Sequence, residues 1–546
     1  MNHKAQIGIL VFVCLAMAFL AGCGSTPTTP VYSYSVSGLE MSNPQGSGPY
    51  YYAIAGSVAI DNQGNVVGGE QDFNDGAGNT SPGDAGATPT PDTIQATKAA
   101  LVLTNGQGTL TLTTNNPNIG VNGVETFGVQ FVNQKHALIV QYDGTATSSG
   151  SLDLQTLPNQ LNGSYAFAMN GMDPDYEPVA FGGVFTTGSN GSTFSGVYDE
   201  NDAENGVSTG NLFPQGVAIS APDSYGRGYI TGLGEGVPTS IVYYVVGAEV
   251  ARLIDVDTTD AGLGSAFGQG STTYSNTSVT SSVFALQSNS HGNLYAAAGQ
   301  ITSPAGGVYQ SGIADEDEQG YVQSGVSISG TYSISNAVNE STYNGYGNLQ
   351  ILSEDEDFNI ANLGVYVTDP SLNLSDPNNS TGGGGALIVD LDDAIPGTGI
   401  MVPQTDTTTA NFTGSYAYGA QEYFCDFCEF DVAGQATMTA GTFNGSGLIS
   451  APDGFVFEED GTAIESTATL TGNPLPDSNE STTGRYTLMT ENETENPLIL
   501  TVAQDPIDFD VVIYQASGGQ LFWLNEDDYS IFLGPIQQQG SLTSLP

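Results

Sequence analysis

Short runs of β-branched and aromatic residues, separated by polar turns, make up most of the chain after about residue 30. In one stretch, for example, the pattern predicts strands at 164–169, 179–185, 193–198, 216–220, 228–233, 240–246 and 249–257. Such runs, bounded by Gly, Asn, Asp and Ser, are typical of β-strands. No segment of ten or more residues has a convincing 3.6-residue period, and 72 glycines would weaken any helix. The pattern therefore predicts an all-β fold.

The strand pattern occurs four times along the chain. In each copy a glycine is followed thirteen positions later by a second glycine. Three positions after that second glycine comes an Asp, or a Ser in the last copy. The four sets are Gly56, Gly69 and Asp72; Gly183, Gly196 and Asp199; Gly299, Gly312 and Asp315; and Gly434, Gly447 and Ser450. Each copy also has a Gly-led turn, which begins at Gly106, Gly226, Gly345 or Gly484. Near its end an acid is followed twelve residues later by Gln155, Gln269, Gln404 or Gln538. Copies of about 115–135 residues have the usual size of complete domains and are too long for solenoid turns.

These repeats predict four tandem antiparallel meander domains. Their expected ranges are 31–157, 158–270, 280–405 and 408–546. Inserted loops are expected at 76–97 in the first copy and 371–385 in the third. Each domain would close as a small barrel or fold as a sandwich, and the strand pattern does not separate these two architectures.

The N-terminus has a different pattern. Lys4 precedes an uncharged apolar stretch from Ala5 to Leu20, which is the pattern of a secretory signal. The tetrapeptide Leu20-Ala21-Gly22-Cys23 resembles the lipobox of bacterial lipoproteins. That resemblance implies that residues 1–22 are a removed signal peptide, that Cys23 carries diacylglycerol, and that its new amino group is acylated. An ordinary signal peptide or an N-terminal membrane helix with a chance cysteine is the alternative.

Residues 23–30 read as the lipidated cysteine followed by a polar, Pro-containing tether. Gly24 stands where an Asp retains Gram-negative lipoproteins at the inner membrane, so the resemblance implies the outer membrane, on its periplasmic or surface-exposed side. Acyl chains contribute about 0.8 kcal/mol per buried methylene, which makes three chains a stable anchor. No later stretch approaches 18 consecutive apolar residues, so no other membrane span is predicted.

Acidic residues greatly outnumber basic ones: 58 Asp and Glu face six Lys and Arg, for a net charge of −52. Removal of the signal would also remove Lys4. This negative charge excludes nucleic acid as a partner. Anionic lipid surfaces would also repel the protein body, so the acyl chains are the expected contact with the membrane. Because unpaired buried carboxylates are costly, nearly all acids are expected on surfaces and loops. A hydrophobic content of 39% argues against disorder.

Acidic clusters follow the repeated aspartate and are candidate calcium sites. The candidate ligands are Asp72 and Asn74, Asp199 and Asn201, and Asp315 and Asp317. The segment from Asp315 to Gly320 is close to the start of a calcium loop, although Gln319 and Val326 depart from the usual ligands. The favoured interpretation is a solvated turn whose acids cap backbone amides. Weak calcium binding is the alternative, and no other cofactor is expected.

Cys425 and Cys428 are the only cysteines after the anchor. A local disulfide is favoured over a redox site or half of a zinc site, because further zinc ligands at motif spacing are missing. His136 and His291 have no Ser or Cys nucleophile motif beside them, so no catalytic residue is predicted. A glycosidase, however, needs only two carboxylates.

The tandem pattern, with its Gly-Ser-Tyr-Ala-Phe-like opening, its Gly-x-x-Asp hairpin end and its Asp-to-Gln close, resembles uncharacterised β-rich tandem-repeat lipoproteins of acidobacterial type. The resemblance covers nearly the whole mature chain and rests on structural motifs. We therefore expect a non-enzymatic outer-membrane or cell-surface lipoprotein with an envelope structural or adhesive role. The alternatives are an extracellular glycan- or calcium-binding protein and, third, a carboxylate-dependent hydrolase. The partner would be a glycan or a surface protein, and the sequence does not indicate the oligomeric state.

Overall fold

The computed structural model describes residues 29–542 except 44–45, 77–89, 157–160, 174–176, 189–192, 235–237, 258–259, 289–294, 303, 319–320, 337–342, 354, 356–357, 380, 393–395, 409–412, 426–427, 440–441, 452–463, 473–474, 477–483, 489–497, 503–504 and 527–530. Apart from one short 3-10 turn, η2 (Asn276–Ser278), the elements named in these residues are strands. The predicted all-β fold is confirmed. Within the described part of the chain, no helix has the length and apolar character needed to cross a membrane.

The first two sheets each contain nine strands. The first holds β1 (Val31–Asn43), β2 (Gly46–Ile60), β3 (Val66–Asn74), β4 (Asp92–Ile94), β5 (Leu101–Thr104), β6 (Gln107–Thr113), β7 (Val124–Asn133), β8 (His136–Gln141) and β9 (Ala146–Leu154). The second holds β10 (Gly163–Met172), β11 (Pro178–Thr187), β12 (Phe194–Asp202), β13 (Gly206–Leu212), β14 (Ala218–Ile219), β15 (Arg227–Thr231), β16 (Ser240–Gly247), β17 (Val250–Asp255) and β18 (Ala261–Gly268).

The third and fourth sheets contain eight and eleven strands. The third holds β19 (Ser282–Ser288), β20 (Tyr295–Thr302), β21 (Val308–Glu318), β22 (Tyr321–Ile334), β23 (Tyr346–Ser353), β24 (Asn362–Thr368), β25 (Gly385–Asp390) and β26 (Thr398–Pro403). The fourth holds β27 (Gly414–Cys425), β28 (Cys428–Thr439), β29 (Thr442–Ala451), β30 (Ile464–Gly472), β31 (Leu475–Pro476), β32 (Arg485–Leu488), β33 (Leu498–Val502), β34 (Asp505–Phe509), β35 (Val511–Ser517), β36 (Gln520–Asn525) and β37 (Ile531–Gln538). We refer to these four units as the first to fourth repeats.

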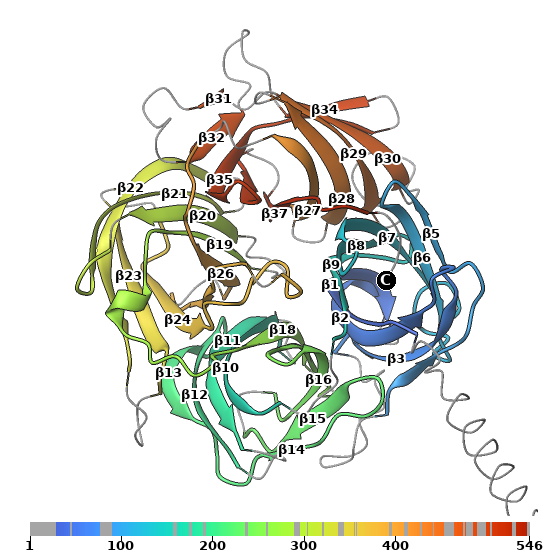
Figure 1. Cartoon of the computed structure of the whole chain (residues 1–546), viewed down its shortest axis with the longest axis horizontal. Coiled ribbons are helices and arrows are strands. Elements are labelled where there is room, and N and C mark those ends of the chain that lie inside the picture. The colour runs from blue at the N-terminus through green and yellow to red at the C-terminus, as the bar shows by residue number, and fades with distance from the viewer. Residues whose placement is uncertain are drawn as a thin grey trace, which may run out of the picture.

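Each repeat curls on itself because its first strand pairs with both its second and its last strand. These antiparallel pairs join β1 to β2 and β9, β10 to β11 and β18, β19 to β20 and β26, and β27 to β28 and β37. The third repeat is a closed barrel, whereas the other three remain sheets with two edges. Figure 1 shows the four repeats arranged as a ring around a common centre.

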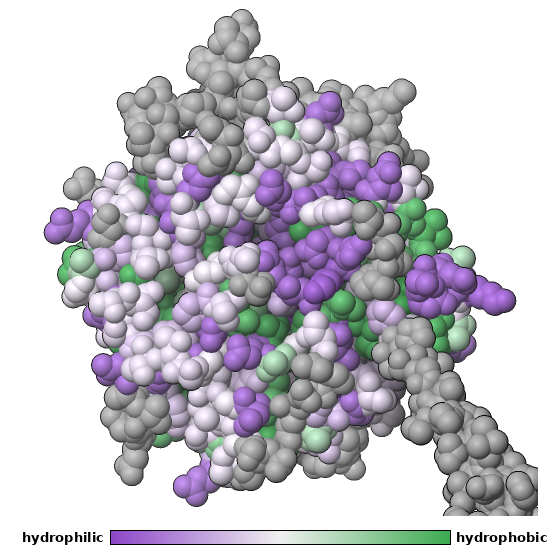
Figure 2. Space-filling model, viewed as in Figure 1, coloured by the Kyte–Doolittle hydropathy of each residue, from purple (hydrophilic) through white to green (hydrophobic). Residues whose placement is uncertain are grey.

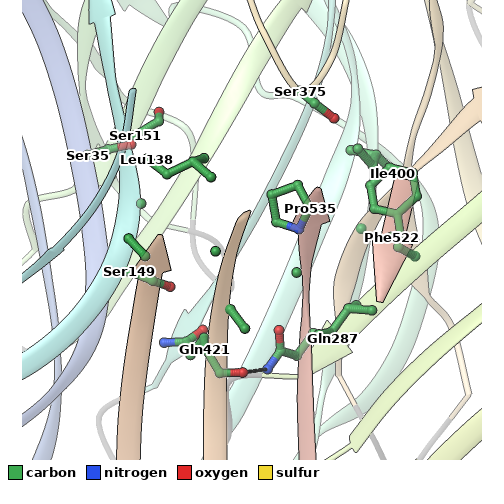
Figure 3. A pocket seen from close by; sticks show the side chains of 18 of the residues that line it. Ser35, Leu138, Ser149, Ser151, Gln287, Ser375, Ile400, Gln421, Phe522 and Pro535 are labelled. Carbon is green, nitrogen blue, oxygen red and sulfur yellow. Dashed lines mark hydrogen bonds between the residues drawn. The ribbon is translucent and has the colours of Figure 1, made fainter. Parts of the chain in front are cut away.

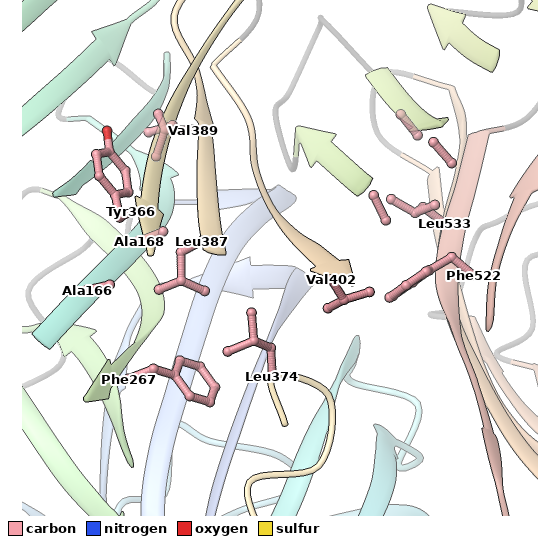
Figure 4. Close-up of a cluster of buried hydrophobic side chains, with 14 of the residues drawn as sticks. Ala166, Ala168, Phe267, Tyr366, Leu374, Leu387, Val389, Val402, Phe522 and Leu533 are labelled. Carbon is pink, nitrogen blue, oxygen red and sulfur yellow. The ribbon is translucent and has the colours of Figure 1, made fainter. Parts of the chain in front are cut away.

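Strand residues pack alternately inside their own repeat and against other repeats. In β10, Phe167 belongs to the core of the second repeat. Ala166, on the opposite face, belongs to a cluster that draws buried residues from all four repeats. Figure 4 shows part of this shared cluster, including Leu387 of the third repeat and Phe522 of the fourth. A strand that is buried on both faces has a nearly continuous run of apolar residues. Such a run does not show which face packs against another repeat, so the sequence did not reveal the ring.

The hairpin of β28 and β29 is tighter than the corresponding hairpins of the other repeats. Thr439 pairs with Thr442, and Ala433 pairs with Leu448. The residues that correspond to Ala433 pair with the repeated aspartates, as Ala55 does with Asp72. Leu448 therefore takes the place of the aspartate in the fourth repeat, and not Ser450 as the sequence spacing suggested.

The glutamine that closes the fourth repeat also differs by one position from the sequence register. The backbone N–H of Gln155 donates to the carbonyl oxygen of Val31. In the fourth repeat, the corresponding bond runs from the backbone N–H of Gln539 to the carbonyl oxygen of Ser415. Gln539 is thus the closing glutamine, in place of Gln538.

Candidate functional site

The closing glutamine of each repeat donates a hydrogen bond to the same backbone position of the next repeat. The Nε2–O distances are 2.8 Å from Gln155 to Val245, 2.8 Å from Gln269 to Val367, 2.9 Å from Gln404 to Gln515 and 2.9 Å from Gln539 to Phe131. We call each contact surface between neighbouring repeats a joint. Because the last bond connects the fourth repeat to the first, the four joints close the ring.

The Gly-led turn is the other half of this contact. Gly226 and Gly345 have φ angles of +83° and +81°, which L-residues rarely adopt. A Cβ atom would lie 2.2 Å from Nε2 of Gln155 at Gly226 and 2.4 Å from Nε2 of Gln269 at Gly345. At Gly484 a Cβ atom would lie 3.0 Å from Nε2 of Gln404, so two sequence motifs that seemed unrelated meet in the first three joints, one supplied by each repeat.

The repeated aspartate also lies in a joint. In the first three repeats it is buried and accepts hydrogen bonds from two side chains of the next repeat. These partners are Arg227 and Tyr244 for Asp72, Tyr346 and Tyr366 for Asp199, and Arg485 and Tyr514 for Asp315. The sequence identified the aspartates but not these partners, which lie more than 140 positions further along the chain.

The geometry of these carboxylates does not favour calcium binding. Nε and Nη2 of Arg227 each lie 2.7 Å from an oxygen of Asp72, in a bidentate ion pair. Asp72 is 2% exposed, so it is not on the solvated turn that the sequence favoured. A cation at this carboxylate would have to displace the guanidinium. The expected caps of backbone amides do occur, since Oδ1 of Asp199 accepts from the amide of Gly210 at 2.8 Å.

The other candidate calcium ligands face turns of the next repeat or are buried. The side-chain amide of Asn74 donates to the backbone carbonyl oxygens of Asp255, Asp257 and Asp260. The side-chain amide of Asn201 donates to the backbone carbonyl oxygens of Asp390 and Asp392. Asp317 is fully buried. Gln319 and Gly320 lie outside the described residues.

A group of acids that the sequence did not identify as candidate metal ligands comes together in the second repeat. Ligand oxygens of Asp255, Asp257 and Asp260 lie within 4.8 Å of one another. Burial and the charges of Asp257 and Asp260 raise the pKa of Asp255 well above its ordinary value. A cavity of about 330 Å³ beside them is also lined by Glu200 and Asp202.

The joint between the fourth and first repeats has an apolar residue at the position of the repeated aspartate. Leu448 replaces the aspartate, and a Cβ atom on Gly128 would come within 2.9 Å of its Cδ1. Gln107 stands where Arg227 and Arg485 stand in their repeats, and its Nε2 lies 3.3 Å from the carbonyl oxygen of Ser446. At this position the joint therefore holds by packing and a neutral hydrogen bond.

Two fully buried acids, Glu429 and Asp431, also lie at this closing joint. Gln421 donates to Glu429 at 2.5 Å, and Thr147 of the first repeat donates to Asp431 at 2.5 Å. Burial raises the pKa of Asp431 to about 7, and burial together with the charge of Asp431 raises that of Glu429. The expectation that nearly all acids lie on the surface is thus wrong here, because protonation removes most of the cost of burying a carboxyl group.

The predicted disulfide and lipid anchor are described only in part. Cys425 and Cys428 are partner positions across the β27–β28 hairpin, which is compatible with a disulfide-closed turn. The disulfide itself stays a prediction. Cys23 and the rest of the lipobox lie outside the described residues.

The inserted loop of the third repeat, between β24 and β25, reaches two other repeats (Figure 1). Its Asp376 accepts a hydrogen bond from Asn133 of the first repeat at 2.7 Å. Oγ of Ser375 accepts from Gln520 of the fourth repeat at 2.6 Å, and the carbonyl oxygen of Ser375 accepts from Gln537 at 3.0 Å. The loop thus ties the third repeat to both sides of the closing joint.

A cavity of about 390 Å³ lies at the centre of the ring, where all four repeats meet. Its lining includes Ser151 of the first repeat, Arg252 of the second, Gln287 of the third and Gln421 of the fourth. Figure 3 shows Ser35, Ser149 and Ser151 on one side and Ile400 and Phe522 on the other. Hydrophilic side chains also gather around the middle of the face shown in Figure 2.

A buried cluster of three ionisable residues forms part of the cavity wall and its support. Nδ1 of His136 lies 2.7 Å from Oδ1 of Asp153, and Nη2 of Arg252 lies 2.5 Å from Oδ2. Although burial opposes the charged form of His136, Asp153 raises the pKa of the imidazole. Burial opposes the ionisation of Asp153, but Arg252 and His136 hold the pKa of its carboxyl group below the usual range. The sequence placed His136 on a strand but could not pair it with Arg252 of another repeat.

No protein-family model and no curated protein matches the sequence. Among solved structures, the chain is similar to a mutant of the vaccine antigen Transferrin Binding Protein B from Haemophilus parasuis Hp5. The TM-score is 0.20 at 10% identity, over 93% of this chain and 95% of that chain. For intact Ap-TbpB with its N and C lobes, the TM-score is 0.17 at 10% identity, over 92% and 94% of the two chains. Scores this low do not place the chain in a family.

Proposed function

We propose that this protein is a lipoprotein of the bacterial outer membrane or cell surface, of the acidobacterial tandem-repeat type. An acylated Cys23 would anchor it, and residues 24–30 would tether the body. Its role would be structural or adhesive and not enzymatic. A glycan or a surface protein would be its partner.

The joints are the observation that carries this proposal. The repeated glutamine, the Gly-led turn and the repeated aspartate all lie where one repeat meets the next. Repetition of these motifs therefore maintains the assembly of the ring and not a set of separate active sites. A rigid body on a lipid tether suits a protein that spaces or presents surfaces in the cell envelope.

Metabolic labelling with palmitate, followed by membrane fractionation, tests the anchor. We expect label and outer-membrane recovery for the natural chain and loss of both for Cys23→Ser. Cys428→Ser is the matched control and should keep the label. Palmitate incorporation that persists in Cys23→Ser would contradict the proposal.

The acid-lined cavity of the second repeat favours calcium binding as a second candidate function, at Asp255, Asp257 and Asp260. Calcium should then raise the melting temperature more than sodium at matched ionic strength, and Asp257→Asn should remove the difference. Equal shifts in both salts would exclude this candidate. A carboxylate-dependent hydrolase would use the acids that line this cavity, Glu200 among them, and turnover of a glycoside panel that is lost in Glu200→Gln would favour it.

A further inference from the structure

We propose that the cavity at the centre of the ring is a binding site for a small organic monocarboxylate with an apolar body. The cavity measures about 390 Å³, within the range of small-molecule sites. It exists only when the ring is assembled, because each repeat supplies part of its wall. The site thus adds a reason for ring closure beyond the proposed envelope role.

The charge of the cavity wall differs from that of the rest of the protein. The chain carries 58 acidic residues, yet no Asp or Glu is among the described residues that line this cavity. The ionisable side chains among them are His136 and Arg252. Because both are basic, the wall favours an anion over a cation.

These two basic side chains also have unused hydrogen-bonding atoms. Nε2 of His136 and Nε of Arg252 are buried and have no hydrogen-bond partner among the described residues. Nδ1 of His136 and Nη2 of Arg252 share a single carboxylate, that of Asp153. Arg252 also donates to two hydroxyls, from Nη1 to Ser265 at 2.8 Å and from Nη2 to Ser151 at 2.9 Å. Asp376, whose charge also acts on His136, accepts from Asn133 and does not line the cavity. A buried N–H without an acceptor costs about 1–3 kcal/mol, so a ligand that brings acceptor oxygens would remove this cost.

The arrangement favours a carboxylate over a phosphate. His136 and Arg252 are bound to the same carboxylate and are therefore neighbours, so that two donors can meet the two oxygens of one ligand carboxylate. A phosphate dianion would bring more charge than two basic groups that already share Asp153 can balance. On the far side, Ile400 and Phe522 present apolar surface for the body of the ligand (Figure 3).

Isothermal titration calorimetry on the Cys23→Ser protein with all four repeats tests this inference. The probes are benzoate and hexanoate, with benzamide and hexanamide as uncharged isosteres, at constant ionic strength. We expect saturable binding of at least one carboxylate, at least tenfold tighter than its amide. Equal binding of acids and amides, or no binding of either carboxylate up to about 10 mM, would overturn the proposal.

Variants locate the site. Arg252→Met should weaken carboxylate binding at least tenfold and leave amide binding unchanged. Ile400→Trp fills the cavity from the opposite wall without touching the basic pair, and it decides the question should Arg252→Met fail to fold. Leu352→Trp, at a side chain that is 61% exposed, is the matched control and should bind like the parent protein. Unchanged affinity in folded Ile400→Trp would place any binding elsewhere and refute the site.

Discussion

Nε2 of Gln539 lies 2.9 Å from the carbonyl oxygen of Phe131, 408 positions earlier in the chain. Gln155, Gln269 and Gln404 form the corresponding hydrogen bond between repeats that are consecutive in the chain. The bond of Gln539 joins the last repeat to the first. Four domains strung on linkers would form the three sequential bonds without this one. The contact between Gln539 and Phe131 is thus one of the contacts that close the ring.

Replacing Gln539 with Ala should destabilise the closing joint. The change removes one partly buried side-chain hydrogen bond, so we expect a loss of about 0.5–1.5 kcal/mol in the free energy of unfolding. Gln538, the exposed neighbour, is the control, and Gln538→Ala should have little effect. Urea unfolding of both variants measures the difference. An equal effect of the two substitutions would contradict the assigned register.

Replacing Asp72 with Ala should cost much more than replacing Asp199 with Ala. Asp72→Ala leaves the guanidinium of Arg227 buried without its counter-charge, a change that typically costs about 3–5 kcal/mol. Asp199→Ala removes the acceptor of two tyrosine hydroxyls, for an expected loss of about 1–3 kcal/mol. Denaturant unfolding compares the two, with the exposed Asp355→Asn as control. The reverse order would show that the ion pair is not what holds the first joint.

The protein should be most stable at mildly acidic pH. Burial raises the pKa of Glu125 to about 8 and that of Asp431 to about 7. Between about pH 4 and these pKa values, the folded chain keeps protons that the unfolded chain has lost. The free energy of unfolding therefore falls as the pH rises, by about 1.4 kcal/mol for each such proton and each pH unit. Below that window stability falls again, because Arg485 holds the pKa of the buried Asp315 below its usual range.

Unfolding free energies measured between about pH 3 and pH 8 test this dependence. Glu125→Gln should make the decline above about pH 5 shallower, because it removes one of the titrating groups. A stability that stays constant or rises across the neutral range would contradict the burial of protonated acids.

Cys425 and Cys428 should be oxidised in the exported protein. Their positions oppose each other across a hairpin, and disulfides persist outside the cytoplasm. Alkylation of the unfolded protein should therefore label neither cysteine before reduction and both after it, as read by mass spectrometry. Labelling of both without reduction would refute the disulfide.

Much of the fold could be read from the sequence, because strand runs and glycine turns are local signals. The joints could not, since Asp72 meets Arg227 at a separation of 155 positions and Gln155 meets a backbone oxygen that no side-chain pattern reveals. Leu448 was missed because a shorter hairpin shifts the register. The central cavity was missed because Asp153 and Arg252 come from different repeats.

Ring closure is the central claim, and a distance measurement between the first and fourth repeats tests it most directly. Nitroxide labels carried by unnatural amino acids at Val102 and Asn444, both exposed, avoid the native cysteines. Pulsed dipolar spectroscopy should give one narrow distance distribution, which persists when Gln538 is replaced by Ala. A broad distribution in the otherwise unaltered chain would show that the fourth repeat does not meet the first, and would contradict the closed ring.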